Sequence, residues 1–469
     1  MDYDVLILGG GIVGCAVGYE LSKYNLNIAI IEKDYDVADD IAVVNTAIVY
    51  DGSETSNALM AGLENIGSEL IKESCKKFNI PYKTIGSLRL SLDEKEGNKI
   101  KDMYKIAKSR GILNVELIGK EQIRKIEPEL VGDYQNALYS KNTAIIAPYD
   151  LAIAYAEVAS DNGVNFRFEE KVLSISKINK GFDVTTNKNK FKCKFVINTI
   201  PDEIYIAEDS EVKAVIKEDN GIRKSMNYLF TEGKVEKNLS KIITKVLDDD
   251  TFIISSPMIN GDTMIGIKYK EKLNIARGIE ITNMILPNLK KCNVSDMVRE
   301  VYKKDEVLID DTDLENGYIR VTGKHYGKLT ITPAIALSIR DRIVLSLNAT
   351  LKKNFIDKKR ESYRIRELSK EEANEIIKLD KRYGNIICAC NYISEGEIVD
   401  CIRRPLGART LEGVKKRTGA GFGSCHGSYC TRKIMNILAR EMDKNFIDIV
   451  KDSKHSRIVW GRIKEFDEV

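Results

Sequence analysis

Four cysteines near the carboxyl terminus have the residue type and the spacing that most directly indicate chemistry. Cys388 and Cys390 form a C-x-C pair, and Cys425 and Cys430 form a C-x4-C pair after a gap of 34 residues. Thiolates bind soft metals, and four of them are enough to hold an iron–sulfur cluster, which passes single electrons. Zinc is the alternative, because four thiolates also make a structural zinc site. Paired zinc ligands usually have about two to four residues between them, so the single residue in the first pair favours an iron–sulfur cluster.

The segment around these cysteines is predicted to form short helices joined by glycine-rich loops. A loop at residues 419–423 precedes the second pair, and a helix is expected from Cys430 to about residue 441. The amino-terminal end of that helix would stabilise anionic sulfur through its dipole. Cys401 falls outside the ligand spacing and is expected to be a buried helix residue, and His426 is expected to be a loop residue.

The amino-terminal segment carries a dinucleotide-binding fingerprint. An apolar run at residues 5–8 predicts a buried strand, and G-x-G-x-x-G, a helix, a second strand and an acid follow it. This is the order of a Rossmann unit, in which the backbone and the helix amino terminus approach a pyrophosphate and the acid binds ribose hydroxyls. A glycine-rich turn that binds nothing is the alternative. The residues in these roles are Gly9, Gly11, Gly14 and Glu32.

Three features favour FAD over NAD as the dinucleotide. The fingerprint lies at the extreme amino terminus, as is usual for FAD enzymes of this type. An apolar run at residues 192–197 predicts a strand that returns to the same sheet much later in the chain. A separate NAD domain would need a second glycine fingerprint, and the sequence contains none.

Composition places the chain among ordinary globular proteins. Its 469 residues, 43% hydrophobic and 30% charged, are too many for one core and predict two or three domains. The net charge of +3, with acids and bases interleaved, argues against a nucleic-acid partner. No apolar run approaches the roughly 18 residues of a membrane span, although peripheral membrane association is compatible with the sequence. Nine cysteines without a secretory signal predict a reducing, cytoplasmic location.

Both halves of the chain resemble known families. From residue 1 to about 350 it resembles FAD-dependent oxidoreductases that include anaerobic-type glycerol-3-phosphate dehydrogenase and L-2-hydroxyglutarate dehydrogenase. The segment from Tyr383 to about Arg440, with all four cysteines, resembles the bacterioferritin-associated ferredoxin-like domain, which carries a 2Fe–2S cluster. The first resemblance is carried by residues 3–33 (YDVLILGG to IIEK), 45–52 (NTAIVYDG), 136–166 and 332–339 (TPAIALSI).

The resemblance implies an α/β fold in three parts. A Rossmann-like FAD-binding domain would contain an inserted mixed β-sheet substrate domain, and a small helical iron–sulfur domain would follow. The oxidoreductase domain would span 1–351, with FAD-binding segments at about 1–80, 145–205 and 315–351 and the substrate domain at about 81–144 and 206–314. A linker and helix would occupy 352–382, the cluster domain 383–451 and a tail 452–469.

The resemblance also implies the cofactors and the residues that contact them. FAD and a 2Fe–2S cluster are expected, the cluster on the four cysteines. The FAD-contacting residues would be Gly9, Gly11, Ile12, Val13, Gly14, Glu32, Lys33, Asn45, Thr46, Val172, Thr199, Lys328, Leu329 and Thr330.

The chain departs from the family pattern near the expected substrate site. A tyrosine stands where the family usually has a histidine, and uncharged residues stand where basic residues commonly follow. A flavin-facing N-A-A-G is also altered, and no glycine–arginine segment is visible around 300–310. A late P-G-L-T turn is altered too, at residues 327–330, ahead of a helix expected from Pro333 to about Leu351. The affected positions are Tyr50, Met60, Gly62, Pro201 and Lys328.

Few residues are candidates for substrate chemistry. His325, the only histidine ahead of the cysteine domain, lies between two glycines and could act as a base or orient a substrate; a solvated loop histidine is the alternative. Tyr50 could donate a hydrogen bond near the flavin or could be a core residue. Lys328, Arg223 and Lys224 could pair with an anionic substrate or lie on the surface.

Two functions remain open from the sequence. In the first, a flavoprotein dehydrogenase oxidises a small hydroxy compound bearing a phosphate or a carboxylate, and electrons pass from FAD to the cluster and on to an acceptor protein or partner subunit. In the second, the chain is a non-catalytic or electron-transfer subunit of a larger oxidoreductase and has lost the family's substrate site.

Overall fold

The structure is a computed structural model that describes residues 1–38, 45–200, 204–205, 214–215, 224–231, 239–248, 251–269, 273–302 and 306–461. Pro201 and Arg223, two residues singled out in the sequence, lie outside the described residues, and the side chain of Lys224 does too.

The first sheet is built around β1 (Tyr3–Leu8). This strand pairs in parallel with β2 (Ile28–Ile31) on one side and with β12 (Lys190–Asn198) on the other, which confirms the predicted return of a late strand to the sheet. β9 (Asn165–Arg167) continues the sheet beyond β2, and β21 (Tyr318–Lys324) continues it beyond β12, both in parallel. Parallel strands covered on both faces are apolar along their whole length, as the fully buried residues 5–8 show.

A hairpin and one later strand complete this sheet. β10 (Val172–Ile178) and β11 (Gly181–Thr186) run antiparallel to each other and lead into β12. β20 (Glu306–Asp310) pairs antiparallel with β21, because a short connection keeps these consecutive strands side by side. The residues of β20 fall in the range expected for the substrate domain, so that range extends too far.

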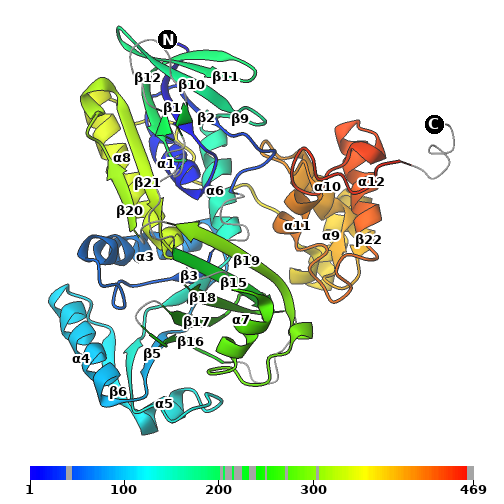
Figure 1. Cartoon of the computed structure of the whole chain (residues 1–469). Helices are drawn as coiled ribbons and strands as arrows, with labels where there is room; N and C mark the ends of the chain where they lie inside the picture. Colours follow the sequence, from blue (N-terminus) through cyan, green and yellow to red (C-terminus); the bar gives the residue numbers. More distant parts are fainter. Residues whose placement is uncertain are drawn as a thin grey trace.

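Four helices pack together with the first sheet (Figure 1): α1 (Ile12–Ser22), α3 (Ala58–Phe78), α6 (Pro148–Asp161) and α8 (Lys328–Leu347). Two of them approach at backbone distance. A Cβ atom on Gly67 of α3 would stand 1.9 Å from the carbonyl oxygen of Thr330 in α8, so glycine is what allows α3 and α8 to meet.

The second sheet has eight strands and its own core. Its order is β19-β15-β18-β17-β16-β5-β7-β6, and it is mixed because β16 pairs in parallel with β5 while the other pairs are antiparallel. Helices α4 (Glu94–Ser109), α5 (Lys120–Ile126) and α7 (Ile275–Thr282) accompany it. The strands are β5 (Ser87–Ser91), β6 (Val115–Gly119), β7 (Asn136–Ser140), β15 (Lys224–Thr231), β16 (Ile242–Val246), β17 (Phe252–Pro257), β18 (Thr263–Tyr269) and β19 (Val294–Tyr302).

A small three-stranded sheet connects the two parts. β8 (Ala144–Ile146) lies between β3 (Ile48–Val49) and β4 (Tyr82–Thr84), antiparallel to both. It brings the segment after β2 beside the start of α6, which follows β8 directly.

The carboxyl-terminal residues form a separate lobe at the right of Figure 1 with a hydrophobic core of its own. Its helix α10 (Glu395–Arg403) begins at a capping box in which Ser394 and Glu397 exchange hydrogen bonds, as such a sequence pair predicts. The elements are α9 (Lys370–Leu379), β22 (Ile386–Cys388), β23 (Ile393–Ser394), α10 (Glu395–Arg403), α11 (Leu411–Thr418) and α12 (Thr431–Met442).

The charged connection ahead of this lobe is bound to the first domain along its length. Asp357 accepts a hydrogen bond from the Tyr19 hydroxyl at 2.8 Å and pairs with Lys77 at 2.6 Å. Arg360 pairs with Asp161 at the end of α6 at 2.7 Å. Among the described residues, no helix has the combination of length and apolar character needed to span a membrane.

Candidate functional site

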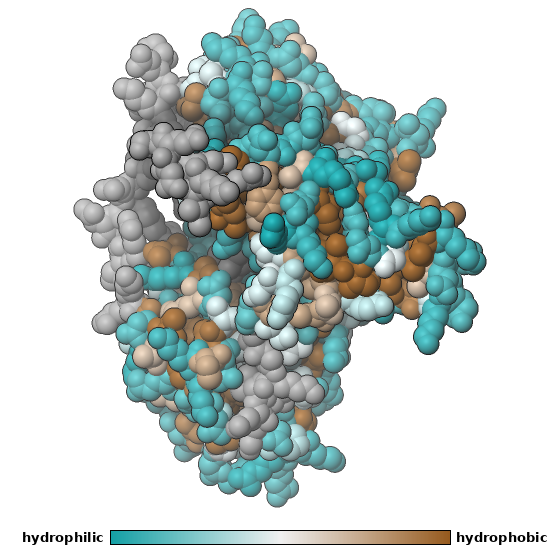
Figure 2. All heavy atoms as spheres, turned by 90° about the vertical axis from the view of Figure 1, so that its right-hand side faces the viewer, coloured by the Kyte–Doolittle hydropathy of each residue, from teal (hydrophilic) through white to brown (hydrophobic). Residues whose placement is uncertain are grey.

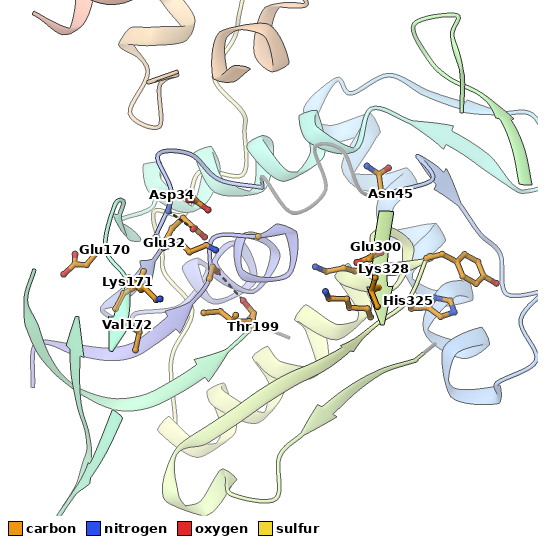
Figure 3. A pocket seen from close by; sticks show the side chains of 18 of the residues that line it. Glu32, Asp34, Asn45, Glu170, Lys171, Val172, Thr199, Glu300, His325 and Lys328 are labelled. Carbon is orange, nitrogen blue, oxygen red and sulfur yellow. Dashed lines mark hydrogen bonds between the residues drawn. The ribbon is translucent and has the colours of Figure 1, made fainter. Parts of the chain in front are cut away.

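A cleft of about 510 Å³ runs from the carboxyl ends of β1 and β2 to the amino-terminal end of α8. Figure 3 shows Glu32, Lys171 and Val172 at one end and Glu300, His325 and Lys328 at the other. The lining residues are Gly9, Gly11, Ile31, Glu32, Lys33, Asp34, Asn45, Glu170, Lys171, Val172, Thr199, Ile200, Arg299, Glu300, Val301, Lys324, His325, Tyr326 and Lys328.

Two glycines of the fingerprint, Gly9 and Gly11, line the cleft between β1 and α1, and Gly14 lies behind them. Gly9 has a φ of +95°, which favours glycine, and a Cβ on Gly14 would stand 2.0 Å from the Gly9 carbonyl oxygen. Gly11 is the N-cap of α1, and no side chain caps that helix end. Glycine therefore fits the turn at Gly9 and the close approach of α1 to it, and the helix end has the polarity that binds a pyrophosphate.

Glu32 follows β2 with its carboxylate held by backbone groups. Its oxygens accept hydrogen bonds from the N–H of Gly10 at 2.7 Å and the N–H of Asp34 at 2.9 Å. Burial raises the pKa of Glu32 to about 7. A carboxylate has about four acceptor positions, so the group can also accept the hydroxyls of an adenosine ribose.

His325 lies at the other end of the cleft and is 5% exposed. Its Nδ1 atom accepts a hydrogen bond from the Gly327 N–H at 3.0 Å, and its ring stacks on Tyr326 with centroids 4.4 Å apart. Glu64 in α3 places a carboxylate oxygen 4.0 Å from Nδ1. Since Nδ1 is an acceptor, the neutral ring carries its proton on Nε2, and His325 is arranged to donate a hydrogen bond.

Tyr50 is buried and is absent from the residues that line the cleft. Its hydroxyl donates to Thr46 at 3.1 Å, and its ring contacts Tyr326 edge to face at 5.3 Å. Burial raises the pKa of Tyr50 well above 10, so the phenol stays neutral. Tyr326, which sequence analysis missed, is the tyrosine that lines the cleft.

Cationic side chains gather near His325. Lys324 and Lys328 come from the end of β21 and the first turn of α8, and Arg299 comes from β19 of the second sheet. Arg299 and Lys324 were also missed by sequence analysis. Only the meeting of the two sheets places Arg299 here, and neither residue belongs to a recognisable motif.

The expected FAD-contacting residues divide into two groups. Those that line the cleft are Gly9, Gly11, Glu32, Lys33, Asn45, Val172, Thr199 and Lys328. Those that lie behind its wall in α1, α8 or the adjoining backbone are Ile12, Val13, Gly14, Thr46, Leu329 and Thr330.

Two sequence interpretations of this region need correction. Residues 328–330 were expected in a turn before a helix at Pro333, yet they form the first turn of α8, with Gly327 as its N-cap. Met60 is packed in the core and Gly62 is exposed on α3, so neither position contributes to the cleft lining.

The four cysteines of the C-terminal lobe lie together as two pairs. The thiol of Cys388 is within hydrogen-bond reach of Cys430, and that of Cys390 is within reach of Cys425. Among the described residues, no three His, Cys, Asp or Glu side chains are gathered closely enough to hold one metal ion. Two thiol pairs fit a [2Fe–2S] cluster, in which four cysteine thiolates hold two irons.

The loops around the thiols allow the backbone to pass close to the cysteines. A Cβ on Gly423 would stand 2.2 Å from the Cβ of Cys390. The N–H of Tyr429 and the thiol of Cys390 lower the pKa of Cys425. Cys401 is buried and its thiol donates to the Ile398 carbonyl at 3.1 Å, as expected for a helix core residue.

Comparisons with known proteins agree with this reading of both halves. A family model described as FAD dependent oxidoreductase matches residues 4–289, and one described as BFD-like [2Fe-2S] binding domain matches residues 386–440. The chain is 32% identical over 480 residues to a glycerol 3-phosphate dehydrogenase of Caloramator mitchellensis, covering 98% of this chain and 99% of that protein. It is 29% identical over 217 residues to mitochondrial L-2-hydroxyglutarate dehydrogenase of Nematostella vectensis, covering 42% and 46%.

Solved structures share the fold over about three quarters of the chain. L-alpha-glycerophosphate oxidase from Mycoplasma pneumoniae with FAD bound has a TM-score of 0.66 at 21% identity, covering 77% of this chain and 99% of that one. Glycine oxidase from Geobacillus kaustophilus has a TM-score of 0.60 at 17% identity, covering 76% and 96%. The chain therefore belongs to the family of FAD-dependent oxidoreductases, with a BFD-like [2Fe–2S] domain at its carboxyl end.

Proposed function

We propose that the chain is a dehydrogenase for glycerol 3-phosphate, or for a similar small hydroxy compound bearing a phosphate or carboxylate. It passes the electrons one at a time through the [2Fe–2S] cluster to an external acceptor. The observation that carries this proposal is the similarity to a glycerol 3-phosphate dehydrogenase along 98% of the chain, with both domains included. The cofactor would supply hydride acceptance and the conversion from two-electron to one-electron transfer.

The cleft supports an anionic substrate at its His325 end. Arg299, Lys324 and Lys328 supply cations from two sheets and a helix, and the amino-terminal end of the 20-residue α8 adds a partial positive charge. Arginine and lysine bind phosphate and carboxylate by charge-assisted hydrogen bonds. Glu300 in the same wall would disfavour a substrate with a second negative group placed near it.

His325 orients the substrate in this proposal. Its Nδ1 accepts a hydrogen bond from the Gly327 N–H, so the neutral ring carries its proton on Nε2, and that N–H would donate to a substrate oxygen. The stacked Tyr326 ring and the tight environment of the imidazole, which is 5% exposed, hold that donor in one orientation.

The carboxyl-terminal lobe exposes part of the proposed cluster site to an external electron acceptor. Cys390 is exposed and Cys425 is half-buried, whereas Cys388 and Cys430 are buried. Figure 2 views the molecule from the side of this lobe and shows apolar atoms among hydrophilic ones there. One edge of the proposed cluster therefore faces the surface, where a one-electron acceptor can approach.

The test is an anaerobic titration of the purified protein loaded with both cofactors. Glycerol 3-phosphate should bleach the flavin absorbance and then produce the low-temperature paramagnetic signal of a reduced cluster. L-2-hydroxyglutarate serves as the alternative substrate with two carboxylates, and we expect it to react more slowly. If FAD is bound and none of these compounds bleaches it, the substrate proposal is wrong and the role of an electron-transfer subunit takes its place.

A further inference from the structure

Residues 32–34, which follow β2, line the cleft. Beyond Asp34 the backbone is fixed against the fingerprint, because the Ala38 N–H donates to the Gly10 carbonyl at 2.8 Å. Asp36 lies between Asp34 and Ala38 and is only 5% exposed. Whatever holds Asp36 therefore helps to hold one wall of the cleft.

The group that holds Asp36 comes from the [2Fe–2S] domain. Arg417, in the last turn of α11, donates from Nη1 and Nη2 to the two carboxylate oxygens of Asp36 at 2.5 and 2.6 Å. The Tyr149 hydroxyl donates to the same carboxylate at 3.1 Å. Both charged side chains are 6% exposed. A bidentate pair buried to this degree fixes geometry strongly, and losing one partner leaves an uncompensated buried charge.

The contact is fitted on both sides. The Nη2 atom of Arg417 also donates to the Leu406 carbonyl at 2.8 Å, which ties the guanidinium to its own domain. A Cβ on Gly413 would stand 2.9 Å from the nearer oxygen of Asp36. The start and the end of α11 thus both close around the aspartate.

A second buried arginine allows an internal comparison. Arg404 donates to both carboxylate oxygens of Glu157 at 3.1 and 3.2 Å, and the two side chains are 8% and 3% exposed. This pair also joins the two domains. Glu157, however, lies on α6, and none of the described residues that line the cleft comes from that helix.

We propose that the [2Fe–2S] domain completes the FAD site. Arg417 is a positioning residue that acts through Asp36: it fixes the segment from Asp34 to Ala38 and so increases the affinity of the cleft for FAD. The inference rests on the placement of FAD in this cleft. Because coupling between two equilibria is reciprocal, FAD must in turn stabilise the docking of α11 by the same factor.

The first experiment measures FAD affinity in the full-length chain after removal of flavin, by quenching of flavin fluorescence. Arg417→Met should raise the FAD dissociation constant about tenfold or more. Asp36→Asn, which keeps the shape of the side chain, should shift it in the same direction. The FAD dissociation constant of the double variant should be no higher than that of the weaker-binding single variant, because the two changes break one interaction.

Arg404→Met is the matched control. It breaks an equally buried arginine–carboxylate pair between the same domains but leaves Asp36 untouched, so we expect a change in FAD affinity of less than about threefold. Thermal unfolding and the cluster absorbance show whether each variant is folded and loaded with its cluster.

The second experiment reads the reciprocal effect without catalysis. Hydrogen exchange of the α11 amides should slow when FAD is added to the wild-type chain, and this protection should be lost in Arg417→Met but kept in Arg404→Met.

Two results would overturn the inference. In the first, Arg417→Met binds FAD as tightly as the wild-type chain. In the second, Arg404→Met raises the FAD dissociation constant as much as Arg417→Met does. Placement of FAD is tested separately by Gly11→Val. If that variant binds FAD normally, the cleft assignment fails; if it does not bind FAD while Arg417→Met does, only the role of Arg417 fails.

Discussion

The Nδ1 atom of His325 accepts a hydrogen bond from the backbone N–H of Gly327 at 3.0 Å. This contact assigns the proton of the neutral ring to Nε2. A histidine with its Nδ1 lone pair occupied in this way is a hydrogen-bond donor at Nε2 and a poor base, and replacement variants can separate these two roles.

Glutamine at position 325 can place an amide N–H close to the position of Nε2, whereas alanine cannot. We therefore expect His325→Gln to lose less than about tenfold in kcat/KM and His325→Ala to lose about ten- to a hundredfold, the value of one hydrogen bond to substrate. Steady-state kinetics with glycerol 3-phosphate checks this. A general base contributes about 10²–10⁴-fold, so a loss of that size in the glutamine variant, together with loss of the acidic limb of the pH profile, would show that His325 takes a proton.

Glu32 predicts a pH dependence of FAD binding. Burial raises its pKa to about 7 in the flavin-free cleft, and ribose hydroxyls donate more strongly to the charged carboxylate. FAD affinity should therefore increase as the pH rises through about 7 and fall by up to about tenfold per unit below it. Fluorescence titration of the apoprotein measures this. Glu32→Gln should bind more weakly with a flat profile, and a persistent slope in that variant would assign the titration to another group.

The same carboxyl group predicts how the stability of the apoprotein varies with pH. Its pKa is raised above the usual 4.5, so the folded state holds the proton more tightly than the unfolded state. The stabilisation is complete below about pH 4.5 and is lost as the pH rises through about 7. Urea unfolding of the apoprotein should show this component, and Glu32→Gln should remove it.

Gly67 and Gly62 provide a matched pair on α3, because Gly67 lies in the contact with α8 whereas Gly62 is exposed. A Cβ at position 67 would stand 1.9 Å from the Thr330 carbonyl, while one at position 62 meets nothing within 4 Å. We expect Gly67→Ala to destabilise the chain by about 3 kcal/mol or more and to weaken FAD binding through α8. Gly62→Ala should stabilise it by about 0.5–1 kcal/mol. Denaturant unfolding checks both, and a neutral Gly67→Ala would mean that α3 and α8 separate easily.

The cysteine pairs predict which thiols the cluster needs. Cys425→Ser should abolish the paramagnetic signal of the reduced cluster, because it breaks the Cys390–Cys425 pair. Cys401→Ser is the control: this thiol is buried in α10 and pairs with a backbone carbonyl, so the signal should persist. Zinc at one atom per chain, with no iron, in the wild-type protein would contradict the cluster assignment.

The parts that could be predicted from sequence were those specified by local pattern. The strand, glycine turn and helix at the amino terminus and the late strand β12 all follow from apolar runs and glycine spacing, and the structure places β12 beside β1. The cysteine spacing likewise predicted that the four thiols act together, and in the structure they lie as two pairs. These features depend on neighbours within a few residues or on a single strand pairing.

The residues at the His325 end of the cleft could not be predicted in this way. Arg299 reaches it only because the edge strand β19 of the second sheet lies against the first domain. Pro333 suggested a helix start, since proline is favoured in a first turn. The helix begins five residues earlier, and the Thr332 hydroxyl donates to the Lys328 carbonyl at 2.8 Å beside the proline.

The connection between Ala349 and Leu368 is bound to the first domain, and this affects how fast electrons can leave the flavin. Asp357 is anchored to α1 and α3, and Arg360 to the end of α6. An electron-carrying lobe on a loose tether must swing into reach, and its transfer rate then falls in viscous solvent. Here the connection is held against the first domain, so the proposed electron transfer to the cluster needs no such movement. The rate of cluster reduction should therefore be the same in buffer and in concentrated glycerol or sucrose.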